Sequence, residues 1–160
     1  MKMSAGTWDV ECCNIALGNG EPMCFEHRNS GGHRLYTEEE KQWWPEDICM
    51  VESKTLPQLM DMFGIKGRYI IKIDCEGGER FLLDDPIAID IIKGCVQFNL
   101  EYHRGFGGKP ERWHEWFRNF TDTHDLFKRT KKPNGPIFEP SIGPDEMWRS
   151  EYMLVRKDGT

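Results

Sequence analysis

The chain has 160 residues, of which 38% are hydrophobic and 30% charged, and its net charge is −6. This length fits a single domain with a real core, and the acidic balance argues against a nucleic-acid partner, which needs a basic face. No apolar run reaches the roughly 18 residues of a membrane-spanning helix, so no membrane segment is predicted. The N-terminus lacks the apolar core of a signal peptide, and a cytoplasmic location is favoured.

Six cysteines are present, and none of them forms a CxxC pair or a zinc-like spacing with histidine. Several lie in or beside apolar, strand-like runs. We therefore expect buried free thiols in a reducing compartment.

Strands dominate the first third of the chain. Residues 8–17 and 22–27 are predicted strands joined by a Gly-Asn-Gly turn, so that residues 8–27 are compatible with a hairpin. Residues 28–47 are polar and predict a long loop with one helical turn. A short strand is expected at residues 48–52.

Residues 55–63 predict a helix with Thr55 as its cap and Pro57 in its first turn, ending at Gly64. The following run, residues 68–74, is apolar apart from Lys72. A continuous apolar run is typical of a strand covered on both faces, as in a parallel sheet.

Further helices and strands alternate in the remainder of the chain. A helix opens at Glu76 and breaks near Pro86, a strand follows at residues 94–103, and residues 111–120 form an amphipathic aromatic helix. Two closing strands are expected at residues 124–132 and 150–157, joined by a long proline-rich connection. This alternation predicts an α/β fold with a mostly parallel sheet.

Ionisable side chains gather where two of these strands end. Asp74 follows the 68–74 run, while Glu101 and His103 end the next strand and point to the same side of it. Since ligands bind at the carboxyl edge of parallel strands, we expect a cleft there that exposes these acids to water. Glu76 is equally compatible with a site and a helix start, and Glu79 is expected to be a first-turn acid or a partner of Lys72.

Four sequence segments resemble the FkbM-type methyltransferase family over residues 8–103: N-I-A-L-G-N-G, V-E-S-K-T-L-P-Q-L, I-I-K-I-D-C-E-G-G-E and Q-F-N-L-E-Y-H. The most specific part is the KIDxEGxE strand end followed by ExH, with a Thr-Leu helix start upstream. Pro57 stands where the family usually has an acid. The positions that match are Thr55, Leu56, Lys72, Ile73, Asp74, Glu76, Gly77, Glu79, Glu101 and His103.

The resemblance implies an S-adenosylmethionine-dependent methyltransferase with a Rossmann-like fold that ends in an antiparallel strand pair. Asp74, Glu76, Glu101 and His103 would orient or deprotonate an oxygen or nitrogen acceptor. Ala16, Leu17 and Asp74 would contact the cofactor. A cation bound by the four catalytic candidates is conceivable, but their spacing does not demand one, and no metal is predicted.

The family's glycine-rich first strand, and the second strand that ends in an acid for the ribose, have no counterpart in this sequence. We therefore expect the chain to be an N-terminally incomplete methyltransferase domain. On its own it should be inactive and bind the cofactor weakly, and an exposed apolar sheet edge should favour self-association. The alternative is a non-catalytic α/β interaction module derived from such an enzyme.

Overall fold

The computed structural model describes residues 2–5, 8–11, 13–26, 35–43, 48–75, 77–103, 110–132, 135–141 and 149–158. The first part of the chain holds short elements: β1 (Lys2–Ala5), β2 (Trp8–Glu11), β3 (Ala16–Leu17), β4 (Met23–Glu26), β5 (Leu35–Tyr36), the 3-10 helix η1 (Glu38–Trp43), β6 (Ile48–Val51), β7 (Ser53–Lys54) and α1 (Leu56–Met62). The second part holds β8 (Ile70–Ile73), the 3-10 helix η2 (Gly78–Leu82), α2 (Pro86–Gly94), β9 (Gln97–His103), α3 (Pro110–Arg118), β10 (His124–Lys132), β11 (Gly135–Pro140) and β12 (Arg149–Arg156).

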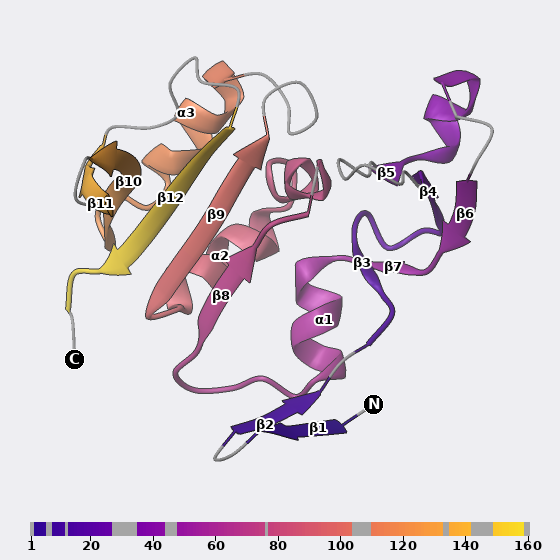
Figure 1. The fold of residues 1–160 in the computed structure, drawn as a ribbon, viewed down its shortest axis with the longest axis horizontal. Helices are drawn as coiled ribbons and strands as arrows, with labels where there is room; N and C mark the ends of the chain where they lie inside the picture. The colour runs from indigo at the N-terminus through magenta and orange to yellow at the C-terminus, as the bar shows by residue number, and fades with distance from the viewer. Residues whose placement is uncertain are drawn as a thin grey trace.

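The main sheet has five strands in the order β11-β10-β12-β9-β8 (Figure 1). Its β8–β9 pair is parallel, whereas the β9–β12, β12–β10 and β10–β11 pairs are antiparallel. The expectation of a mostly parallel, Rossmann-like sheet is therefore wrong: the sheet is mixed. The antiparallel closing pair, β10 and β12, is present as predicted.

The first strands of the chain explain this difference. They do not join the main sheet but form separate small sheets: β1 with β2, β3 parallel to β7, and β5-β4-β6. The predicted hairpin over residues 8–27 is also wrong, because β4 pairs with β5 and β6 rather than with the preceding strand. Alternating strands and helices indicated a parallel sheet, but the pattern does not say which strands share one sheet.

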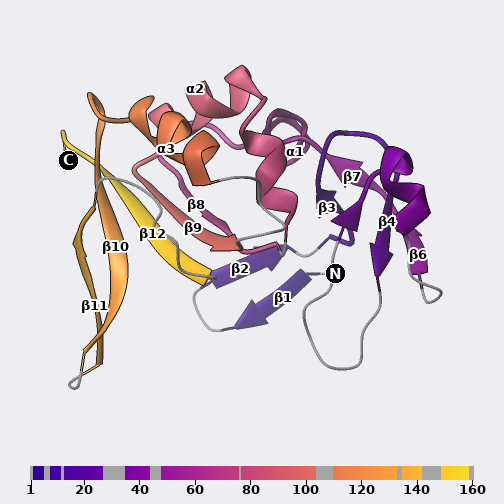
Figure 2. The same cartoon turned by 90° about the horizontal axis from the view of Figure 1, so that it is seen from above.

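The hydrophobic core lies between one face of the main sheet and the helices α2 and α3, which Figure 2 shows on the same side of β8, β9 and β12. Phe98, Leu100 and Tyr102 alternate along β9 and are all buried. The aromatic stripe of residues 113–120 packs on them, with the Trp113 ring 5.6 Å from that of Tyr102, centroid to centroid. The predicted amphipathic helix is confirmed, and its aromatic residues belong to the core.

The other face of β8 is not covered by the described residues. Ile70 is 63% exposed and Lys72 is exposed, while Ile71 and Ile73 face the core. The apolar run was therefore wrongly interpreted as a strand covered on both faces. We call the side of the sheet that carries Ile70, Lys72 and Asn99 the open face.

Helix capping follows the sequence closely. The Thr55 hydroxyl accepts the Gln58 main-chain N–H, and the Gln58 side chain accepts the Thr55 N–H, which together form a capping box at α1. The Asp85 carboxylate caps α2 by accepting the main-chain N–H groups of Ile87 and Ala88, so Pro86 begins that helix instead of only ending the previous one. The predicted connection after β10 contains a strand that the sequence analysis missed, β11, which forms a hairpin with β10.

Five of the cysteines fall among the described residues, and all five are free thiols: Cys13, Cys24, Cys49, Cys75 and Cys95. Within the described ranges, no helix combines the length and the apolar character that crossing a membrane requires.

A buried histidine predicts how stability depends on pH. Burial lowers the pKa of His124 below its ordinary 6.5, although a hydrogen bond to the Cys95 carbonyl and the nearby Asp125 and Asp158 partly oppose the shift. The unfolded chain thus takes up a proton near pH 6.5 that the folded chain resists, so the free energy of unfolding falls as the pH drops below about 6.5.

Replacing His124 by glutamine, which retains an N–H donor, should make this decline shallower. Urea unfolding at several pH values between 7 and 5 measures the slope. The matched control is His114→Gln on α3, which should keep the wild-type slope; equal slopes for wild type and His124→Gln would contradict the assignment.

Candidate functional site

The ends of two neighbouring parallel strands bring the predicted site residues together. Ile73 of β8 pairs with Leu100 of β9, so the residues that follow them emerge at the same edge of the sheet. One potential ligand atom from each of Asp74, Glu101 and His103 lies within 4.8 Å of the others. The sequence prediction that these three side chains share one edge is confirmed.

Glu79 is the organising residue of this cluster and is fully buried. Its Oε1 accepts the main-chain N–H of His103 at 3.0 Å and lies 3.2 Å from Nδ1 of the same residue. Its Oε2 accepts the Gly77 N–H at 2.7 Å, and the Cys75 thiol is 3.7 Å away. The carboxylate thus connects the turn after β8 to the end of β9.

His103 lies between two carboxylates. Its Nε2 is 3.2 Å from Glu101 Oε1, and its Nδ1 faces Glu79 on the other side. An ionised carboxylate can only accept hydrogen bonds, so the tautomer of His103 that carries its proton on Nδ1 satisfies the contact with Glu79. The Glu79 contact therefore fixes the orientation of the imidazole and directs Nε2 towards Glu101.

The expectation that these acids emerge into water is correct for one of them. Asp74 is exposed and pairs with Lys72 at 3.7 Å, but Glu79 and Glu101 are buried. Glu79 is also not the partner of Lys72. Glu101 lies within β9 and Glu79 within η2, and their positions in the sequence did not reveal that both would be buried.

Two glycines make this turn possible for different reasons. Gly77 has φ of 103°, a left-handed conformation that glycine adopts without strain. A Cβ at Gly78 would lie 2.9 Å from both the Leu17 carbonyl oxygen and the Cys75 sulfur. The chain therefore packs backbone against backbone here, and β3, with Ala16 and Leu17, lies beside the turn that follows Asp74.

The remaining predictions for residues of the site have different outcomes. The Leu17 carbonyl lies beside Gly78, and the assignment of Ala16 and Leu17 to the cofactor stays a prediction. Glu76 lies outside the described residues. Glu79 was missed as a site residue; a signal existed, because two glycines before an acid allow the chain to fold back over the strand end.

The thiol in this region is poorly suited to nucleophilic chemistry. Burial raises the pKa of Cys75 well above its ordinary value of 9.0, and the neighbouring Glu79 raises it further. Since the thiolate is the reactive form, Cys75 is a protonated, structural thiol at neutral pH.

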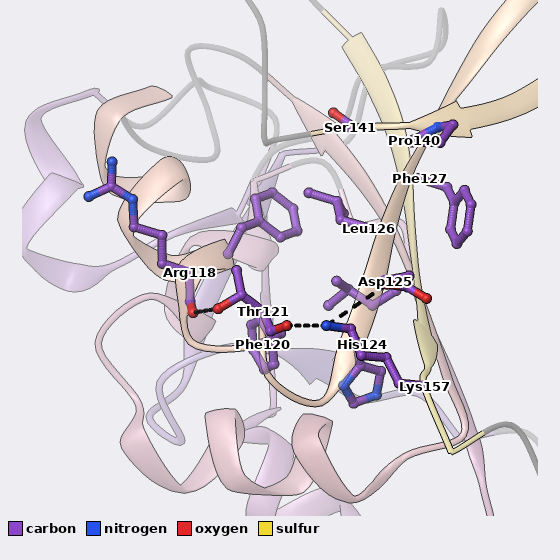
Figure 3. Close-up of a pocket in the computed structure, with 12 residues that line it drawn as sticks. Arg118, Phe120, Thr121, His124, Asp125, Leu126, Phe127, Pro140, Ser141 and Lys157 are labelled. Carbon is purple, nitrogen blue, oxygen red and sulfur yellow. Dashed lines mark hydrogen bonds and ion pairs between the residues drawn. The ribbon is translucent and has the colours of Figure 1, made fainter.

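A pocket of about 520 Å³ lies at the opposite end of the sheet, between the end of α3 and the start of β10 (Figure 3). His124 pairs with Arg156, and Val155 pairs with Gln97, so this is the end where β9 begins. None of the predicted site residues lines it. Glu101 instead lines a hollow of about 130 Å³ on the open face, with Lys72 and Asn99.

No family model, curated protein or solved structure matches this chain. The resemblance to the FkbM-type family therefore stays a prediction from the sequence.

The hydrogen bonds of Glu79 predict a large effect on stability. Replacing Glu79 by alanine leaves the buried N–H groups of Gly77 and His103 without their acceptor, at about 1–3 kcal/mol each. We expect the free energy of unfolding to fall by about 3 kcal/mol or more, and by less for Glu79→Gln, which keeps one acceptor oxygen.

Urea unfolding at pH 7 measures these differences. Glu38→Ala is the control, because Glu38 is exposed and pairs with Lys41 on the surface, and it should stay within about 0.5 kcal/mol of wild type. A wild-type urea midpoint for Glu79→Ala would show that these bonds do not support the fold.

Proposed function

We propose that the chain carries the acceptor side of an S-adenosylmethionine-dependent methyltransferase that methylates an oxygen or a nitrogen. The observation that carries the proposal is the convergence of Asp74 with Glu101 and His103. These residues belong to the two most specific sequence elements of the resemblance, KIDxEGxE and ExH, and lie at one edge of two parallel neighbours.

The chemistry of the cluster suits this reaction. Methyl transfer needs an acceptor placed in line with the donor and, for a hydroxyl or an ammonium group, a base that removes its proton. Asp74 is exposed and can bind an acceptor, while Glu101 and His103, oriented by Glu79, provide acceptor atoms for a proton. The donor supplies an electrophilic methyl group on a sulfonium.

The size and charge of the site limit the acceptor. The hollow beside Glu101 has about 130 Å³, well below the roughly 300 Å³ of a typical ligand pocket, so it has room for a small functional group rather than a whole cofactor. Asp74 and His103 do not line it. The net charge of −6 and the carboxylates of the site disfavour a nucleic-acid acceptor.

The test is transfer of a labelled methyl group by the protein as its gene encodes it. The protein is incubated with methyl-labelled S-adenosylmethionine and a panel of hydroxyl- and amine-bearing compounds, and incorporation is counted. Asp74→Asn should lower transfer by about 100-fold or more, the scale of a general acid–base contribution, while largely sparing binding of the donor.

Asp90→Asn is the matched control, since Asp90 is an exposed aspartate on α2, outside the cluster. If Asp74→Asn and Asp90→Asn transfer the methyl group at the same rate, Asp74 takes no part in the mechanism. Absence of transfer across the panel would favour the non-catalytic interaction module.

The edge of the sheet predicts self-association. β8 is the last strand of the main sheet among the described residues, and it presents Ile70 on the open face. An unpaired strand edge with an exposed apolar side chain favours pairing with a second copy. Sedimentation velocity should show concentration-dependent association that Ile70→Lys weakens.

Ile87→Lys is the control for this prediction, because Ile87 is 60% exposed but lies on α2. If both lysine variants and wild type sediment as the same monomer at every concentration, the edge does not mediate association.

A further inference from the structure

The cluster at the strand ends has the composition of a metal site. Two carboxylates, of Asp74 and Glu101, and one imidazole, of His103, place ligand atoms within 4.8 Å of one another. Glu101 Oε1 and His103 Nε2 are already 3.2 Å apart, close to the roughly 3 Å between neighbouring ligands of an ion with bonds of about 2.1 Å. From this geometry we propose that Asp74, Glu101 and His103 bind a divalent first-row transition-metal ion.

A second observation concerns the carboxylate that contacts the other ring nitrogen of His103. Metal-binding histidines usually donate their other ring N–H to a carboxylate, which fixes the tautomer and makes the ligating nitrogen more basic. The fully buried Glu79 holds this position, 3.2 Å from His103 Nδ1, and it also binds the main-chain N–H of that residue. Glu79 is thus a positioning residue that directs Nε2 towards Glu101.

The charge of the cluster favours a dication. Three carboxylates, those of Asp74, Glu79 and Glu101, surround one imidazole, and two of them are buried. Grouping negative charges in a region of low dielectric is costly unless positive charge accompanies them. A divalent ion provides that charge at the point where the side chains converge.

Asp74 supplies the adaptable ligand. Its carboxylate is exposed and 3.7 Å from the ammonium of Lys72, which is itself well exposed. An exposed side chain changes rotamer at little cost, so the Asp74 carboxylate can turn from Lys72 towards the other two ligands. The site therefore closes on an ion without a change in the buried part of the fold.

The ligand set indicates which ions fit. Imidazole suits zinc, iron and related transition metals, carboxylates suit manganese and harder ions, and a mixed set of two oxygens and one nitrogen favours Mn²⁺ or Zn²⁺ over Ca²⁺ or Mg²⁺. Three protein ligands leave coordination positions open, as in catalytic rather than structural sites. An open position can take an acceptor hydroxyl and acidify it. This catalytic role rests on the proposed methyl transfer, but binding of the ion is independent of it.

Mn²⁺ is the probe of choice, because the free thiols of this chain compete more strongly for Zn²⁺. The chain, treated with a chelator and then desalted, is titrated with Mn²⁺, and free Mn²⁺ is followed by electron paramagnetic resonance. We expect saturable binding of one ion that is displaced by Zn²⁺, together with a rise in the thermal unfolding midpoint as Mn²⁺ is added.

The variants make the test specific. Glu79→Gln should weaken binding by about 10- to 100-fold, the usual cost of losing a partner behind a ligand, and Asp74→Asn by at least as much. Since Asp74 is exposed, its variant should fold even if Glu79→Gln does not. Asp90→Asn, on the surface of α2, should bind Mn²⁺ as wild type does.

Two results would overturn the proposal. Absence of saturable Mn²⁺ binding would make the cluster an ion network held together by a protonated His103. Equal affinity for wild type and Asp74→Asn would show that the ion binds elsewhere. Neither methyl donor nor acceptor enters this titration, so metal binding and methyl transfer can succeed or fail separately.

Discussion

The rest of the site depends on the hydrogen bonds that the buried carboxylate of Glu79 accepts. Glu79 is fully buried, and its two carboxylate oxygens accept hydrogen bonds from Gly77 in the turn after β8 and from His103 at the end of β9. A buried carboxylate is stable only when it is hydrogen-bonded, so the fold must hold these N–H groups in place to keep it. That requirement joins the two strand ends, orients His103 and defines where Glu101 and Asp74 meet.

Local structure was largely predictable from the sequence. The helix at α1, the strand cores at β8 and β9, the aromatic helix α3 and the closing strands β10 and β12 all follow from periodicity and capping residues. The juxtaposition of Asp74 with Glu101 and His103 was predictable too, because it requires only that β8 and β9 be parallel neighbours. These features depend on residues close in sequence or on one strand pair.

Three other features were not predictable, for different reasons. Nothing in the residues of β3 or β4 says that they form small sheets of their own, and β11 was hidden by its prolines, Pro136 and Pro140, which are tolerated in an edge strand. Glu79 does lie in the first turn of η2, as its position in the sequence predicted, but its burial did not follow from that position. The close approach of β3 to this turn, at Gly78, is a tertiary contact that only the three-dimensional structure reveals.

That close approach has a mechanical consequence. At Gly78, the Leu17 carbonyl oxygen and the Cys75 sulfur already occupy the space where a side chain would begin. A contact between two stretches of backbone has no rotamers through which it can yield, and packed protein interiors transmit displacement rather than absorb it. A side chain at Gly78 would therefore displace either Leu17 or the turn that bears Glu79, whose carboxylate accepts the main-chain N–H of His103.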